Sequence, residues 1–308
     1  MYLGVAGACA EQKANSAIEF ADLSSLSLDS TADYGAALIE VVMSPTELIA
    51  GEFGTTNTPA KSYTFSGSIP SFASANDTLS LNGYASRSLG FGDDGNYFYV
   101  GRSHTNKFSR FTLSTPYDIG TAGSPQNSGN VNPAWSPQGL HLHPDGDTMF
   151  AVAASSVFKL SMTTNWQISS GFTQAAAYDL SGDSDGLGDA IGGLTGIRFS
   201  PTGKKMYVCY AADTSNTETG STGHSKVTQF DLSTAWDVSS RTLNSTIDLH
   251  PDIGYFSFTP PNPPSAPEPV GVRALVSGID FSPDGQKLIV SSAHQDVNSG
   301  EYKVLLYA

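Results

Sequence analysis

Apolar and polar residues alternate along this chain in short runs, and turn residues separate the runs. Alternation with a period of two indicates β-strands that bury one face. One phrase recurs four times with a period near fifty residues: an apolar run, a tight turn with glycine, and a second apolar run. The copies are SLGFGDDGNYFYV, GLHLHPDGDTMFAV, GIRFSPTGKKMYV and GIDFSPDGQKLIV, with turn glycines Gly95, Gly146, Gly203 and Gly285. Each copy predicts a β-hairpin, because glycine supplies the positive φ of such turns.

A second phrase follows the hairpin and predicts a third strand. It reads KFSRFTLSTPYDIG at 107–120, SVFKLSMTTNWQIS at 156–169 and KVTQFDLSTAWDVS at 226–239. Stretches such as AAAYDLSG at 175–182 then predict a fourth strand. Four-stranded units repeated at this period are typical of the blades of a β-propeller. Tyr117, Trp166 and Trp236 occupy equivalent places in the repeat, and we interpret them as structural aromatics.

The fold class that we predict is all-β: one β-propeller domain over 1–308, built from antiparallel four-stranded blades. We favour five blades, closed into a ring by an N-terminal strand for which SAIEFADL at 16–23 is the candidate. The alternative counts MYLGVAGA and SAIEFADL as strands of a sixth, incomplete blade. The expected boundaries are 1–30 for the closing strand, 31–85 for a degenerate blade, 86–130, 138–182, 194–250 and 275–308 for clear blades, and 251–274 for a proline-rich insertion loop.

Long, variable connections follow the second and fourth strands and predict one interaction face. Short turns lie on the other face, which we interpret as scaffold. Three histidines, His104, His224 and His294, fall in equivalent two-to-three loops and are candidate ligand or partner contacts. The insertion adds the candidates Tyr255, Phe256 and Phe258.

One loop, DLSGDSDGLGDAIGG at 179–193, carries spaced aspartates among glycines. Asp183, Asp185 and Asp189 are therefore candidate ligands of Ca²⁺, which prefers carboxylate oxygens on a flexible loop. A closing bidentate glutamate is missing, so a plain solvated turn is the alternative, and we expect no other cofactor. The chain has no Ser-His-Asp order, P-loop or CxxC motif. We therefore assign no catalytic residues and expect the chain not to be an enzyme.

Composition limits the classes of partner that we expect for this chain. The net charge of −14, with only 14% charged residues, disfavours nucleic acid. No stretch is apolar enough to span a bilayer, and the N-terminal apolar run lacks the basic region of a secretory signal. Two cysteines are too few for a disulfide framework. Cys209 lies in the apolar run KKMYVCY and reads as a buried thiol, with a Cys9–Cys209 bridge as the alternative.

The FSPDG hairpin resembles the repeats of the Tol-associated periplasmic propeller and of lactonase-like propellers. Its pairing with FDLSTAWDVS is similar to repeats of structural proteins of marine tailed bacteriophages. This resemblance covers roughly 84–308, with a faded copy at 36–85. It implies a propeller and a place in the virion, as a capsid decoration or as a tail or fibre component. The implied partners are other virion proteins and a host surface glycan or protein.

Two alternatives remain at this point. The first is a secreted bacterial propeller that binds glycan or protein. The second is a metal-dependent lactonase or hydrolase propeller that uses the long-loop face.

Overall fold

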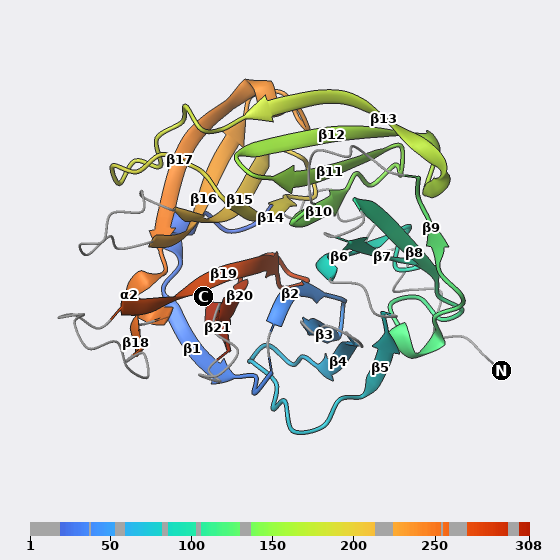
Figure 1. Ribbon diagram of the computed structural model, residues 1–308, viewed down its shortest axis with the longest axis horizontal. Coiled ribbons are helices and arrows are strands. Elements are labelled where there is room, and N and C mark those ends of the chain that lie inside the picture. Colours follow the sequence, from blue (N-terminus) through green and yellow to red (C-terminus); the bar gives the residue numbers. More distant parts are fainter. Residues whose placement is uncertain are drawn as a thin grey trace, which may run out of the picture.

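The computed structural model describes residues 19–36, 38–52, 59–81, 86–102, 106–129, 137–212, 224–253, 255–258, 270–294 and 302–308. These residues form five four-stranded antiparallel blades around a common axis (Figure 1). The predicted all-β propeller with five blades is confirmed. The helical elements of this part are short: η1 Leu23–Ser25, η2 Ile119–Thr121, η3 Val238–Ser240 and α2 His250–Ile253. Among the same residues, no helix is long and apolar enough to cross a membrane.

Each blade is a meander whose first strand lies nearest the axis. Blade 1 is β2 Leu38–Met43, β3 Glu47–Glu52, β4 Pro59–Thr64 and β5 Asp77–Ser80. Blade 2 is β6 Ser86–Gly92, β7 Tyr97–Arg102, β8 Lys107–Thr112 and β9 Gln126–Asn127. Blade 3 is β10 Gly139–Leu142, β11 Thr148–Ala153, β12 Ser156–Thr164 and β13 Gln167–Asp179. Blade 4 is β14 Leu194–Phe199, β15 Lys205–Ala212, β16 His224–Leu232 and β17 Arg241–Asp248.

Blade 5 combines strands from the C-terminal region of the chain with one strand from the N-terminal region. Its inner strands are β19 Val270–Phe281, β20 Leu288–His294 and β21 Lys303–Tyr307, and its outer strand is β1 Leu28–Asp33. Figure 1 shows the blue strand β1 beside the red strand β21. The two pair antiparallel from Leu28 opposite Tyr307 to Asp33 opposite Lys303. Closure by an N-terminal strand is therefore confirmed, but at a different segment from the predicted 16–23.

The predicted closing segment has another structure. Residues 16–18 lie outside the described part, and the remainder runs as extended chain into the 3-10 turn η1. The strand pattern misled the prediction because alternating residues also occur in an extended segment that pairs with no strand.

The proline-rich insertion also differs from the predicted loop. It begins with α2 and continues with β18 Tyr255–Phe258, which pairs antiparallel with the start of β19. That pairing makes the sheet of blade 5 five-stranded. β19 begins at Val270, inside the predicted loop, because the inner strand extends beyond its pairing with β20 and accepts β18 as a second neighbour. Residues 259–269 lie outside the described part.

The repeated aromatics are structural, as predicted. Each adopts a positive φ of 63–65° and donates its backbone N–H to the carbonyl oxygen of a turn glycine at 2.8–3.0 Å. The pairs are Tyr117 with Gly95, Trp166 with Gly146 and Trp236 with Gly203. Each ring lies over its glycine so closely that a Cβ there would overlap the ring. The turn therefore needs glycine twice, for its positive φ and for the space that the ring fills.

Close packing at the axis also depends on glycine. A Cβ on Gly139 would lie 2.6 Å from the Cα of Gly196, and a Cβ on Gly278 would lie 3.1 Å from the Cα of Glu40. These residues belong to the inner strands of four blades, so the strands of this narrow ring meet almost backbone to backbone. Side chains larger than hydrogen at these positions would force the blades apart.

One buried arginine joins the inner strands across the axis. Arg198, on β14, donates from Nη1 to the carbonyl oxygen of Leu140 on β10 at 2.8 Å. Its Nη2 lies 3.5 Å from the carbonyl oxygens of Val41 on β2 and Leu89 on β6. A single guanidinium thus contacts backbone acceptors of three other blades, and its planar array of donors suits that geometry.

Two buried carboxylates complete the centre. Arg198 Nε lies 3.1 Å from Asp280 Oδ1 on β19, and Nη2 lies 3.2 Å from Glu40 Oε1 on β2. Glu40 also accepts the backbone N–H of Leu89. Burial raises the pKa of Glu40 to about 8, although Arg198 opposes the shift. One guanidinium faces two carboxyl groups here, so a proton on Glu40 relieves the excess negative charge.

Cys209 agrees with the expected buried thiol. It is fully buried on β15 and is a free cysteine among the described residues, which do not include Cys9. Burial raises the pKa of its thiol to about 12, so the group is not ionised at neutral pH.

Replacing Arg198 should destabilise the ring strongly. We expect Arg198→Met to lower the free energy of unfolding by about 3–5 kcal/mol, because Asp280 stays buried without its cation and three blades lose a shared donor. The matched control is Arg241→Met, whose partner Asp183 is partly exposed at the periphery, and we expect a loss below about 1 kcal/mol. Urea denaturation measures both. Equal losses in the two variants would contradict the central role of Arg198.

Alanine at a turn glycine separates backbone strain from ring contact. Gly203 and Gly67 both have positive φ, but a Cβ at Gly67 meets nothing within 4 Å, whereas at Gly203 it meets the indole of Trp236. We expect Gly67→Ala to cost about 1–2 kcal/mol from the left-handed backbone alone. Gly203→Ala should cost clearly more, since the indole must move. Thermal unfolding of both variants checks this, and equal shifts would show that the ring contact adds nothing.

Candidate functional site

The segment before β1 continues the repeat of the blades. Ala21 donates its N–H to the carbonyl oxygen of the turn glycine Gly285 at 2.9 Å, as Trp236 does to Gly203 in blade 4. The 3-10 turn η1 follows Ala21, as η3 follows Trp236, and the first residue of each turn is buried. ADLSS at 21–25 is thus the counterpart of WDVSS at 236–240. The N-terminal segment supplies blade 5 with the second half of its repeat.

Blade 4 holds residues 19–25, which we call the closing segment, by its polar side chains. Lys205 donates to the carbonyl oxygen of Phe20 at 2.8 Å, and the Tyr207 hydroxyl donates to that of Ala21 at 3.1 Å. Gln229 accepts the N–H of Leu23 at 2.9 Å. Phe20 also stacks on Phe281 of blade 5, with 4.2 Å between the ring centroids. Blade 4 is therefore connected to blade 5 through the closing segment.

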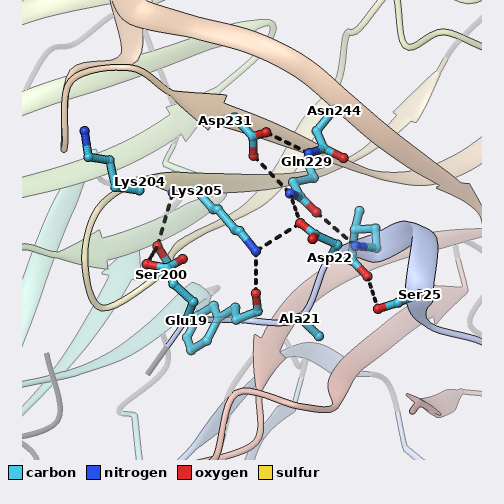
Figure 2. A network of polar contacts seen from close by, with 12 residues as sticks. Glu19, Ala21, Asp22, Ser25, Ser200, Lys204, Lys205, Gln229, Asp231 and Asn244 are labelled. Atoms are coloured by element: carbon cyan, nitrogen blue, oxygen red, sulfur yellow. Dashed lines mark hydrogen bonds and ion pairs between the residues drawn. The ribbon is translucent and has the colours of Figure 1, made fainter. Parts of the chain in front are cut away.

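Asp22 departs from the repeat at this junction. The equivalent residues Asp118 and Asp237 each accept a backbone N–H of their own 3-10 turn, at 2.9 and 3.0 Å. Asp22 makes no such capping bond. Its Oδ1 instead lies 2.9 Å from Lys205 Nζ and accepts from Gln229 Nε2 at 2.8 Å (Figure 2). These two hydrogen bonds lower the pKa of Asp22, so it is ionised at neutral pH.

An open cleft lies where the closing segment meets blade 4. We call it the closing cleft; its volume is about 530 Å³. Figure 2 shows its polar side chains around Lys205. They come from the closing segment, the one-to-two turn of blade 4, and strands β15–β17. The lining residues are Glu19, Asp22, Thr202, Lys204, Lys205, Asp231, Leu232 and Asn244.

Glu19 is the least satisfied group of the cleft. Its Oε1 accepts from the Ser200 hydroxyl at 3.2 Å, while Oε2 is buried and has no hydrogen-bond partner in the described part of the chain. Burial raises the pKa of Glu19, against the Ser200 hydrogen bond and Lys205. A second carboxylate, Asp231, accepts from Asn244 Nδ2 at 2.7 Å and from Gln229 Nε2 at 3.1 Å. The cleft thus combines the ionised carboxylate of Asp22, the carboxyl group of Glu19 with its raised pKa, and the side-chain amide of Asn244.

The residues predicted for the long-loop face are placed only in part. His104 lies outside the described residues. His224 begins β16 opposite Ala212, and His294 ends β20 opposite Ala274, so both lie at the two-to-three end of their blades. Tyr255, Phe256 and Phe258 lie in strand β18 rather than in a loop. A shared site of these residues stays a prediction.

The three candidate calcium ligands are partnered by cations of the protein. Asp185 and Asp189 both bind the ammonium of Lys226, and Asp189 Oδ2 lies 2.7 Å from it. Arg241 Nε lies 2.7 Å from Asp183 Oδ2. Burial would lower the pKa of Lys226, but the two carboxylates outweigh it and raise that pKa. No group of three ligating side chains that could hold a metal occurs among the described residues. The calcium site stays a prediction.

The sequence reasoning missed the closing cleft. It placed binding on the long-loop face, whereas the cleft adjoins the one-to-two turn of blade 4. A signal was present in the printed sequence: ADLSS at 21–25 matches YDIGT at 117–121 and WDVSS at 236–240. That match predicts the closing segment. The position of Lys205 beside Asp22 depends on the ring and could not be read from the sequence.

Comparison with known proteins gives structural neighbours alone. No family model and no curated protein matches the chain. Similar solved structures include hydrazine synthase from Kuenenia stuttgartiensis, at 12% identity and a TM-score of 0.43, covering 86% of this chain and 57% of that chain. A putative 6-phosphogluconolactonase from Bacteroides uniformis has 14% identity and a TM-score of 0.40, covering 85% and 67%. The periplasmic gluconolactonase PpgL from Pseudomonas aeruginosa has 16% identity and a TM-score of 0.42, covering 85% and 69%.

These neighbours correct one expectation. The prediction that the chain is not an enzyme is contradicted, because the propellers that it resembles include proteins named as lactonases. We therefore do not retain it. At this level of similarity, the neighbours transfer no activity, substrate or partner to this chain.

Calcium dependence can be tested through Lys226. Because the Lys226 ammonium occupies the space between Asp185 and Asp189, we expect the melting temperature to be the same in calcium chloride and in EDTA. Lys226→Ala should melt lower in EDTA, since Asp185 is buried, and calcium should recover part of the loss. A calcium-dependent rise in the unaltered chain would instead support the sequence-based calcium site.

Proposed function

We propose that this chain is a binding propeller of a tailed-bacteriophage particle, where it serves as a capsid decoration or as a tail or fibre component. The observation that supports the proposal is the repeat itself. In blade 4 the FSPTG hairpin and the DLSTAWDVS phrase build one unit, in which Trp236 lies over the turn glycine Gly203. These phrases are similar to the repeats of phage structural proteins noted above.

The geometry suits a binding role. The ring is closed by strand β1 and braced by Arg198 at its centre, so its surfaces are held in fixed relation. Rigid scaffolds of this kind bind through the loops and clefts that they present. The closing cleft presents polar side chains at the surface of this scaffold, where a partner can reach them. We expect this partner to be a virion protein or a host surface glycan or protein.

Immunogold labelling of purified particles tests this proposal. With antibody against the chain, we expect label on particle heads or tails, and none after the antibody is absorbed with purified protein. Label confined to the particle-free lysate would contradict the virion role. It would favour a secreted binding propeller.

A lactone assay addresses the alternative activity directly. The purified chain is incubated with gluconolactone and acid release is followed by titration at constant pH. Release well above the spontaneous rate would move the assignment from binding to catalysis.

A further inference from the structure

We infer that the closing cleft binds a hydroxyl-rich ligand of saccharide chemistry. The inference rests on the proposed binding role and gives that role a place and a ligand class. The cleft lies on the face of the one-to-two turns, away from the loops to which the sequence pointed. Its volume of about 530 Å³ falls within the range of about 300–1,000 Å³ that small-ligand sites occupy.

Asp22 presents a carboxylate oxygen to the cleft. The fold offers this residue a capping role that Asp118 and Asp237 fill, and Asp22 does not take it. Its side chain remains 49% exposed although Oδ1 binds Lys205 and Gln229. The carboxylate is thus fixed by one oxygen, and the other is open to the cleft. A fixed carboxylate with an open oxygen is a strong acceptor for a ligand hydroxyl.

Hydrogen-bond donors and acceptors alternate along the cleft. Lys205 stands beside Asp22, and Asn244 stands beside Asp231. A hydroxyl group both donates and accepts, so neighbouring hydroxyls of one ligand can bond to a carboxylate and to an ammonium or amide at once.

The charges of the cleft disfavour other small ligands. The cleft is lined by the carboxyl groups of Glu19, Asp22 and Asp231 and by two lysines, of which Lys205 binds Asp22 and Lys204 donates to the carbonyl oxygen of Ser233. An anion would meet the carboxylates on a chain whose net charge is −14. A cation would compete with the two lysines. A neutral polyol avoids both costs.

Saturation-transfer NMR of the full chain with glucose, galactose and N-acetylglucosamine tests the inference. We expect transfer to at least one sugar, followed by titration of that sugar. Asn244→Ala and Asp22→Asn should each weaken its affinity at least tenfold. The printed hydrogen bond of Asn244 is to Asp231 within blade 4 and not to the closing segment, so its variant guards against loss of ring closure as the cause. Asp118→Asn, at the same repeat position in blade 2, is the matched control and should bind as the unaltered chain does.

Two results would overturn the inference. One is the absence of transfer to all three sugars. The other is binding that Asn244→Ala and Asp22→Asn leave unchanged, which would place the sugar elsewhere. Neither result bears on particle labelling, so the proposed virion role and the cleft fail separately. Thermal unfolding of each variant confirms that the ring is closed under the conditions of the titration.

Discussion

The ring depends on a non-local contact, because blade 5 takes its outer strand β1 from the N-terminal region of the chain. Strand β1 pairs with β21, and the segment before it bonds to the turn glycine Gly285 and to side chains of blade 4. This contact joins residues about 280 positions apart, so it carries a large loop-closure cost and must recover it through many bonds at once. The edge of β21 and the junction with blade 4 are thus both covered by the N-terminal region.

The centre of the ring depends on close backbone packing and on one buried arginine. Five inner strands meet so closely that a side chain at Gly139, Gly196 or Gly278 would overlap a neighbour. The backbone carbonyls that face the axis need donors, and Arg198 supplies them to three blades. Its charge is balanced by Asp280, and Glu40 lies beside it as a second buried carboxyl group with a raised pKa, so the arrangement is costly to break. A buried guanidinium with two carboxyl groups also fixes the relative register of the blades that carry them.

Ring closure and the closing cleft have the same origin. In blades 2 and 3, Tyr99 and Arg110 donate to the carbonyl oxygen of Trp166, which joins one blade to the next. In blades 4 and 5, Tyr207 makes the corresponding bond to Ala21, and Lys205 adds a bond to Phe20. There the segment carries Ala21 in place of a large aromatic, and Asp22 turns from its cap toward Lys205. The redirected Asp22 lines the cleft together with Lys205, so the residues that close the ring also form the cleft.

The sequence by itself determined the blade. The spacing of FSPDG and DLSTAWDVS placed the hairpins, the turn glycines and the structural role of Tyr117, Trp166 and Trp236, because these features are local and repeat. It also indicated five blades and closure by an N-terminal strand, while the segment it chose was wrong, since two extended stretches differ only in which edge they meet. Only the tertiary structure placed Lys205 beside Asp22, Lys226 between Asp185 and Asp189, and Arg198 at the axis. Each of these contacts joins residues far apart in the chain, or on different blades, and no local pattern encodes such a distance.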